Sequence, residues 1–270
     1  MSEFPEVCEQ VENKLAQFTI GFVKFNDLES DAKLAGSGTL VSCGSSFAIL
    51  TADHVIENLS LVDPIGVVVP VGGSSLGRRH RVTLDMRTVR RLTIGQASHS
   101  HSGPDLGLLM LSPPDAAKLQ NWQSFYNLAK RRDSMLFSPP SIEDGGWFLA
   151  GFVDELTTEH GAESGFTKVM GFRGLCGAGV VFEGAGEPPF DYLNFEVKYD
   201  ETVQGPISFE GSSGGGLWQV RFRKVDNRIE IADALLSGVA FYQSDRRNDQ
   251  RIIYCHGRHS IYGTVCETLS

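Results

Sequence analysis

Short runs of apolar residues, some of them alternating with polar ones, fill the first half of the chain. The alternation at 19–25 has the period of a β-strand with one buried face. The other runs are short and rich in apolar or β-branched residues, as strands are. The predicted strands of this half are 19–25, 38–42, 47–51, 67–71, 82–94 and 106–111. Six strands predict a first β-barrel over residues 19–135.

A proline-rich polar stretch at 138–146 then interrupts the pattern, as a linker does. Beyond it the predicted strands are 147–153, 166–172, 192–199, 216–222, 229–242 and 251–256. These six predict a second β-barrel over residues 136–270. The pattern therefore indicates an all-β chain of two six-stranded antiparallel β-barrels.

Helices are predicted only near the two ends. Val7, Val11, Leu15 and Phe18 recur at helical spacing, which predicts an amphipathic helix within an N-terminal extension over residues 1–18. Its apolar face could pack on its own barrel or dock on a partner. A closing C-terminal helix capped by Ser260 is also predicted.

Composition narrows the class of protein. The chain has 270 residues, of which 41% are hydrophobic, enough to bury either one large core or two smaller ones, and two suit the spacing of the motifs. Its formal net charge of −9 disfavours a protein that binds nucleic acid or an anionic membrane. The N-terminus has neither a basic leader nor an apolar segment of signal-peptide type, so we expect a cytoplasmic protein without a membrane anchor.

The five cysteines predict neither a disulfide framework nor a metal centre. Their number is odd and no Cys-x-x-Cys spacing occurs, which favours buried thiols. His99 and His101 could chelate a metal, but no carboxylate or cysteine pattern completes such a site. We therefore expect neither metal nor cofactor.

Three short motifs carry polar residues of the kinds that catalyse acyl transfer. His54 ends the run TADH, Asp105 opens the run DLGLL, and Ser213 is the central residue of GSSGG. Taken singly, Asp105 is better explained as a turn residue and His54 as a capping or surface residue. The three together, in the order His, Asp, Ser, point to one site.

These runs resemble the signature motifs of the trypsin-like serine peptidases, the chymotrypsin-fold family. That family has TAxH around its histidine, DLAL around its aspartate and GxSGG around its serine. His54 and Asp105 fall in the first half and Ser213 in the second, as in the family, whose site lies in the cleft between two β-barrels. The resemblance extends from about Phe18 to the end and is to intracellular bacterial members.

The resemblance implies a catalytic triad. The Ser213 hydroxyl is then the nucleophile, His54 the base that takes its proton, and Asp105 the carboxylate that orients the imidazole. The backbone N–H groups of Gly211 and Ser213 are expected to form the oxyanion hole.

One departure from the family bears on regulation. Secreted digestive members carry an Asp before the nucleophile, and it pairs with an α-amine released by activation cleavage. Ser212 stands there in this chain, and no Ile or Val followed by Gly-Gly marks a cleavage site near the start. We expect no zymogen switch. Intracellular bacterial relatives lead us to expect instead that a partner or ligand sets the loop.

The resemblance also suggests a specificity pocket. Ile207 takes the place of the Asp that trypsin-like specificity puts at the pocket base, and an Ile cannot pair with a buried cation. The run LSGVAFYQ resembles the pocket wall, with Phe241 and Tyr242 as substrate-binding residues. An apolar or small P1 residue is expected.

The sequence therefore predicts a serine endopeptidase that acts on polypeptides through an acyl-enzyme. Two alternatives stay open: a non-catalytic module that binds peptides or proteins on the same fold, and an esterase or thioesterase that uses the same triad. The oligomeric state is not indicated.

Overall fold

The computed structural model describes residues 3–25, 32–60, 64–70, 80–161, 168–172, 174–198, 205–226, 228–247 and 250–270. Parts of the predicted strands 67–71, 166–172 and 192–199 lie outside these residues. The elements of the first half are α1 (Glu3–Ala16), β1 (Thr19–Phe25), β2 (Ala32–Cys43), β3 (Ser46–Thr51), α2 (Asp53–Leu59), β4 (Ile65–Val69), β5 (His80–Leu84), β6 (Arg90–Gly95), β7 (Leu106–Met110), α3 (Pro113–Gln120), β8 (Tyr126–Asn127) and α4 (Arg132–Phe137).

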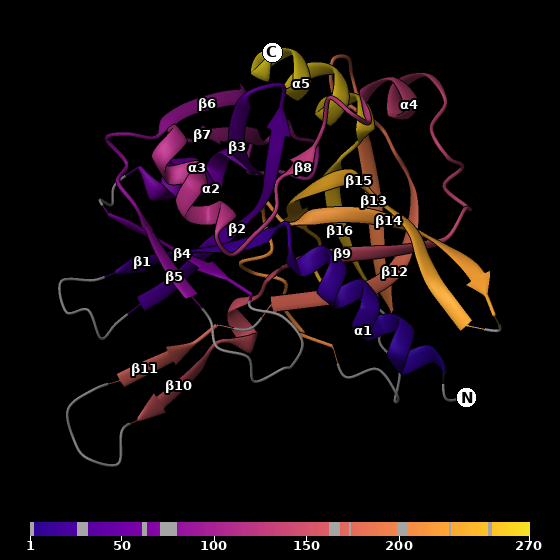
Figure 1. The fold of residues 1–270 in the computed structure, drawn as a ribbon, viewed down its shortest axis with the longest axis horizontal. Coiled ribbons are helices and arrows are strands. Elements are labelled where there is room, and N and C mark those ends of the chain that lie inside the picture. Colours follow the sequence, from indigo (N-terminus) through magenta and orange to yellow (C-terminus); the bar gives the residue numbers. More distant parts are fainter. Residues whose placement is uncertain are drawn as a thin grey trace.

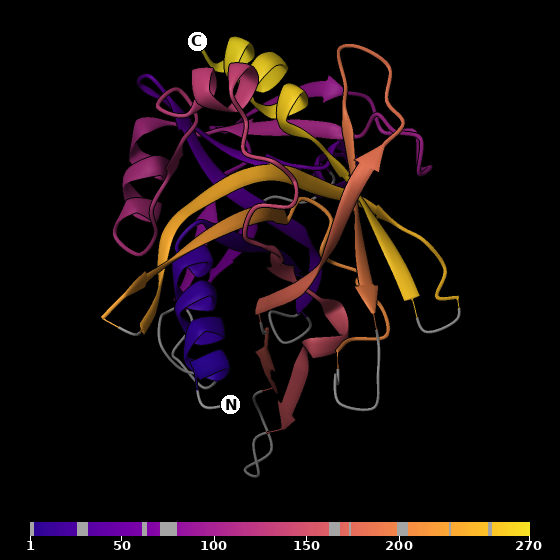
Figure 2. The ribbon, with the colours of Figure 1, turned by 90° about the vertical axis from the view of Figure 1, so that its right-hand side faces the viewer.

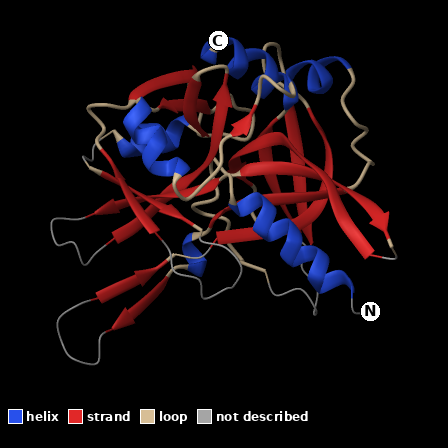
Figure 3. Cartoon of the chain, in the orientation of Figure 1, coloured by secondary structure: helices blue, strands red, loops and turns tan. Residues whose placement is uncertain are grey.

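The second half contains β9 (Gly146–Phe152), the 3₁₀ turn η1 (Asp154–Leu156), β10 (Thr158–Gly161), β11 (Lys168–Gly171), β12 (Gly174–Gly184), β13 (Tyr192–Lys198), β14 (Gly216–Val225), β15 (Arg228–Gln243), β16 (Gln250–His256), the π-helical segment η2 (His259–Val265) and α5 (Cys266–Leu269). Strands dominate both halves, and the helices lie around them (Figure 3). The prediction of a mostly β chain with few, short helices is confirmed.

The first half forms one open sheet rather than the predicted closed six-stranded barrel. Its strands follow the order β5-β4-β1-β2-β3-β7-β6, and β8 pairs in parallel with β2 as an eighth strand. The run 82–94 is not one strand, because Asp85 turns the chain by accepting hydrogen bonds from the backbone N–H groups of Arg87 and Thr88. The two resulting strands, β5 and β6, lie at opposite edges and do not pair.

The second half forms a sheet that closes on itself. The closed order is β12-β13-β16-β15-β14-β9, with antiparallel pairing throughout (Figures 1 and 2). Five of its strands match predicted ones. The sixth is β12 rather than the predicted strand 166–172, whose described part is β11 in a separate two-stranded hairpin with β10.

The glycine-rich sequence of β12 explains why it was missed. Glycine weakens most strands, because fixing its flexible backbone costs conformational entropy and it has no side chain to pack. Here the Phe195 ring packs against Gly179, where a Cβ atom would lie 2.6 Å from the ring edge. The missing side chain therefore makes room inside the closed sheet.

The two sheets share an apolar core. One cluster joins Leu50 of β3 and Leu108 of β7 to Trp218 of β14 and Val239 of β15. All described strand pairings nevertheless stay within one half. The predicted domain limits stay a prediction, but the core shows that the halves pack directly on each other.

Both terminal helices pack on the protein itself. Val11 and Leu15 of α1 are fully buried and join the shared core, with α1 lying against β15 (Figure 1). The apolar face of α1 therefore already has a partner within the chain. No helix in the described parts of the chain combines the length and apolarity needed to cross a membrane.

Ser260 does not cap the C-terminal helix as predicted. Asp191 does so from outside, because its carboxylate accepts hydrogen bonds from the backbone N–H groups of His259 and Ser260 at 3.0 and 2.7 Å. The Ser260 hydroxyl is buried and also contacts that carboxylate. A carboxylate that is distant in the sequence thus caps the helix that Ser260 was predicted to cap.

Candidate active site

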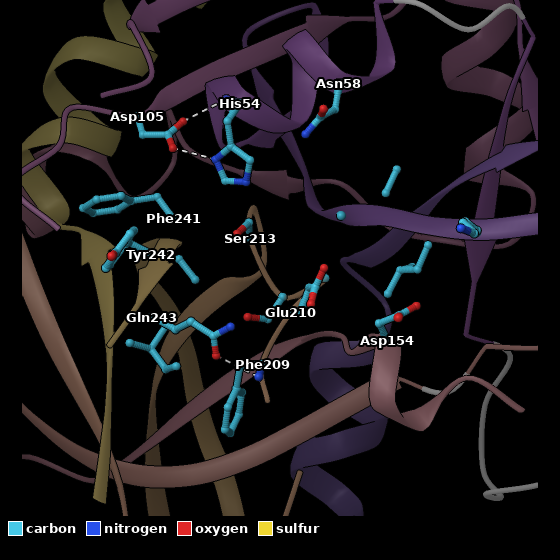
Figure 4. Close-up of a pocket in the computed structure, with 18 of the residues that line it drawn as sticks. His54, Asn58, Asp105, Asp154, Phe209, Glu210, Ser213, Phe241, Tyr242 and Gln243 are labelled. Atoms are coloured by element: carbon cyan, nitrogen blue, oxygen red, sulfur yellow. Dashed lines mark hydrogen bonds and ion pairs between the residues drawn. The ribbon is translucent and has the colours of Figure 1, made fainter. Parts of the chain in front are cut away.

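A cavity of about 950 Å³ lies between the two halves and collects the residues of all three motifs. His54 and Asp105 come from the first half, and Ser213 comes from the second (Figure 4). One wall is formed by Ala240, Phe241, Tyr242 and Gln243 of β15. The opposite end is lined by residues of β1 and β2 that include Lys24 and Leu34.

Asp105 holds His54 at two points. Its Oδ2 lies 2.6 Å from His54 Nδ1, and its Oδ1 accepts the backbone N–H of His54 at 2.9 Å. The carboxylate is almost completely buried, whereas about a quarter of the imidazole is exposed. An ionised Asp105 requires Nδ1 to carry a proton, so in the neutral form of the imidazole Nε2 is the unprotonated nitrogen.

The start of α2 places His54 beside this carboxylate. Asp53, in the first turn of α2, is buried and accepts hydrogen bonds from Thr93 Oγ1 at 2.8 Å and from the backbone N–H of Ala97 at 3.1 Å. An anion in this first turn also suits the helix dipole. Asp53 therefore ties the helix that carries His54 to the chain segment after β6.

Ser213 lies beside the His54 ring in the cavity (Figure 4). No hydrogen bond joins its hydroxyl to the imidazole among the described residues. Such contacts are often long without substrate and shorten when it binds. The structure thus brings the three predicted residues to one cavity and joins two of them directly.

The backbone around Ser213 has an informative hydrogen-bond pattern. From Phe209 to Gly214 every carbonyl accepts a hydrogen bond; the donors, in order, are Ser212 N–H, Asp154 N–H, Ser37 Oγ, Gly215 N–H, Ser37 N–H and Thr39 Oγ1. Most N–H groups of the segment also have acceptors. Within the described chain, the exceptions from 207 to 215 are the N–H groups of Gly211 and Ser213. These are the two predicted oxyanion donors.

Two glycines make this turn possible. Gly211 and Gly214 have φ values of +91° and +87°, which side chains other than glycine rarely adopt. A Cβ atom on Gly214 would lie 2.1 Å from both the carbonyl oxygen of Ser37 and Oγ1 of Thr51. The turn can therefore pack tightly against β2 and β3.

His256 is a buried second histidine that the sequence did not reveal as part of the site. Its Nε2 accepts the backbone N–H of Asp105 at 3.0 Å. The rings of Phe241, Tyr192 and Phe190 surround it, with centroids 4.9, 5.1 and 5.4 Å from its own. This burial lowers the pKa of His256 to about 4, so the ring stays neutral and Nε2 remains an acceptor.

Ile207 lies outside the cavity, contrary to the specificity prediction. The residue is 59% exposed, and the Glu155 carboxylate accepts the backbone N–H groups of Ile207 and Ser208 at 3.1 and 2.8 Å. Phe209 and Ile253 line the cavity and are only 3% and 1% exposed. The residue found by counting back from Ser213 therefore does not line the cavity, and the P1 preference stays a prediction.

Gln243 crosses the space between β15 and the segment before Ser213. Its Oε1 accepts the backbone N–H of Phe209 at 2.9 Å and is also hydrogen-bonded to Arg251, while its Nε2 lies 3.4 Å from Ser208 Oγ (Figure 4). Ile253 is its direct neighbour on β16. The predicted substrate-binding residues Phe241 and Tyr242 line the same wall.

The described residues contain no cluster of three or more His, Cys, Asp or Glu side chains that could hold a metal ion. All five cysteines are free thiols, and Cys43, Cys255 and Cys266 are buried.

No model of a known protein family matches the chain, and a search of curated proteins finds no relative. The chemistry of the site must therefore be argued from its geometry.

Proposed function

We propose that the protein is a serine endopeptidase that hydrolyses peptide bonds through an acyl-enzyme on Ser213. The observation that carries the proposal is the pair of N–H groups of Gly211 and Ser213, which have no acceptor within the described chain and belong to residues that line the same cavity. A hydrolase that forms a tetrahedral intermediate needs two such donors beside its nucleophile.

The proposed first step is the attack of Ser213 Oγ on the carbonyl carbon of the scissile bond. His54 Nε2 takes the hydroxyl proton as the new C–O bond forms, and the carbonyl oxygen becomes an oxyanion that accepts hydrogen bonds from the two N–H groups. The imidazolium is stabilised by Asp105, 2.6 Å from Nδ1. It then protonates the leaving amine as the C–N bond breaks.

The second step frees the enzyme. A water molecule attacks the acyl carbon while His54 Nε2 takes one of its protons, and the same two N–H groups stabilise the second oxyanion. Collapse of this intermediate returns the proton to Ser213 Oγ and releases the new carboxylic acid, which then loses its proton to solvent. No group beyond the chain's own residues and water is required.

The fold supports the family that we infer. Two mostly antiparallel β units, with His54 and Asp105 on one and Ser213 on the other, are compatible with a chymotrypsin-like arrangement. The open first sheet departs from a strict pair of six-stranded barrels. We infer a trypsin-like serine peptidase with this variation.

The cavity walls favour a small or short apolar P1 residue. A polypeptide could add to the edge near Phe241 as an extra strand, which places its P1 side chain toward Phe209 and Ile253. Gln243 occupies part of that space and is hydrogen-bonded at both ends of its amide. A long P1 side chain would have to displace it.

A fluorophosphonate probe tests the proposal. It should label wild-type protein at Ser213, and Ser213→Ala should lose both labelling and peptide hydrolysis by at least about 10³-fold. Comparing peptide with ester substrates separates an endopeptidase from an esterase. A wild-type protein that binds peptides yet is neither labelled nor active would identify the non-catalytic module.

A further inference from the structure

Ser37 is a buried serine of β2 that contacts the nucleophile segment from the opposite half of the chain. Its Oγ donates to the carbonyl of Gly211 at 2.7 Å and accepts the backbone N–H of Phe152, also at 2.7 Å. Its own backbone N–H donates to the carbonyl of Ser213 at 2.8 Å. One residue thus connects β2, β9 and the turn that carries the nucleophile.

A hydroxyl has one proton to donate, and two carbonyls lie within reach of Ser37 Oγ: that of Gly211 at 2.7 Å and that of Phe152 at 3.3 Å. The shorter distance assigns the proton to Gly211. The next carbonyl back along the chain, that of Glu210, accepts the backbone N–H of Asp154 at 2.8 Å. Because the Glu210–Gly211 peptide is trans, fixing its carbonyl toward Asp154 points the Gly211 N–H the opposite way.

We propose that Ser37 is a positioning residue. Together with the Asp154 N–H it forms a lock, which holds the turn at 210–214 in the conformation that presents the N–H groups of Gly211 and Ser213 to an oxyanion. The inference rests on the proposed function. Ser212 cannot pair with a liberated amine as a carboxylate would, and the turn is instead held by donors that are always present. The uncleaved 270-residue chain therefore needs no activating partner for turnover.

Ser37→Ala removes the side-chain half of the lock. We expect kcat for a peptide substrate to fall by roughly 10- to 100-fold, with KM changed less than about twofold, because oxyanion contacts strengthen in the transition state. Affinity for a peptide boronate, which forms a tetrahedral adduct, should fall in parallel, whereas affinity for a cleavage-product peptide should not. Ser42→Ala, a buried serine on the same strand, is the matched control.

Asp154→Pro tests the backbone half. Asp154 is the first residue of η1 and follows an extended Val153, a backbone that accepts proline. Proline removes the N–H donor and the carboxylate, and its Cδ atom takes the place of the amide hydrogen, so the Glu210 carbonyl must turn away. Asp154→Ala removes the carboxylate alone. We expect kcat of the Pro variant to be at least about tenfold below that of the Ala variant. Equal kcat values for these two variants would overturn the proposal.

The outcomes also separate this proposal from the proposed function. If wild-type protein hydrolyses peptides and Ser37→Ala matches Ser42→Ala, the lock is wrong and the peptidase stands. A requirement for cleavage or a partner, detected by intact mass or reconstitution, overturns the lock as well. If wild-type protein is inactive, crystal structures of both forms decide: a Glu210–Gly211 peptide plane unchanged in Ser37→Ala refutes the role of Ser37.

Discussion

His256 should make the folding stability of this protein depend on pH in the mildly acidic range. Burial lowers its pKa in the folded protein to about 4, from a value of 6.5 in an unfolded chain. Between these values the unfolded state binds more protons than the folded state. The contribution of His256 to the free energy of unfolding is therefore fully present above about pH 6.5 and is lost as the pH falls toward 4.

The size of the effect follows from the same two values. Acidification from pH 7 to pH 5 should remove about 2 kcal/mol of the free energy of unfolding through His256 alone, and the full shift corresponds to about 3 kcal/mol. This is a large fraction of the stability of an ordinary domain, about 5–15 kcal/mol.

His256→Gln isolates this contribution. The Gln Oε1 can accept the N–H of Asp105 in place of the imidazole Nε2, but it does not titrate. Urea unfolding at pH 7 and pH 5 should show a loss about 2 kcal/mol larger in wild-type protein than in the variant. His101→Gln, which changes an exposed histidine, should behave like wild type. An equal loss in wild type and His256→Gln would refute the neutral, buried state of His256.

Three other substitutions test the geometry. Asp105→Asn should slow fluorophosphonate labelling of Ser213 by about 10³- to 10⁴-fold, since the imidazole is held in the wrong tautomer; a near-normal rate would argue against its role. Gly214→Ala should lower the free energy of unfolding in urea by roughly 2–4 kcal/mol, because its Cβ would meet Ser37 and Thr51; unchanged stability would contradict the packing. Gln243→Gly should raise kcat/KM for Leu relative to Ala at P1 by about 10- to 100-fold in a peptide library; an unchanged preference would place the pocket elsewhere.

The sequence predicted those features that local patterns encode. Alternation and β-branched runs predicted most strands, and three motifs predicted that His54, Asp105 and Ser213 share one site. The structure places all three at one cavity, while their catalytic role remains a prediction. Each of these signals lies within a few consecutive residues.

What the sequence could not reveal depends on contacts between distant residues. Ser37 acts on Gly211, 174 positions away, and nothing near a serine in a strand marks such a role. His256 is equally unmarked, because its function comes from the backbone of Asp105. Ile207 was expected in the cavity but does not line it, and the turn held by Glu155 cannot be predicted from a count of residues.

The dependence of Asp105 on His256 has a consequence for the order in which the molecule is made. A growing chain exposes His54 and Asp105 first, Ser213 later, and His256 only once β16 has been made. Because a chain emerging from a ribosome folds from the N-terminus onward, His54 and Asp105 exist for some time without Ser213 and without the acceptor that His256 provides. The surroundings of Asp105 are therefore complete only after the second sheet has formed, although the residue itself belongs to the first half.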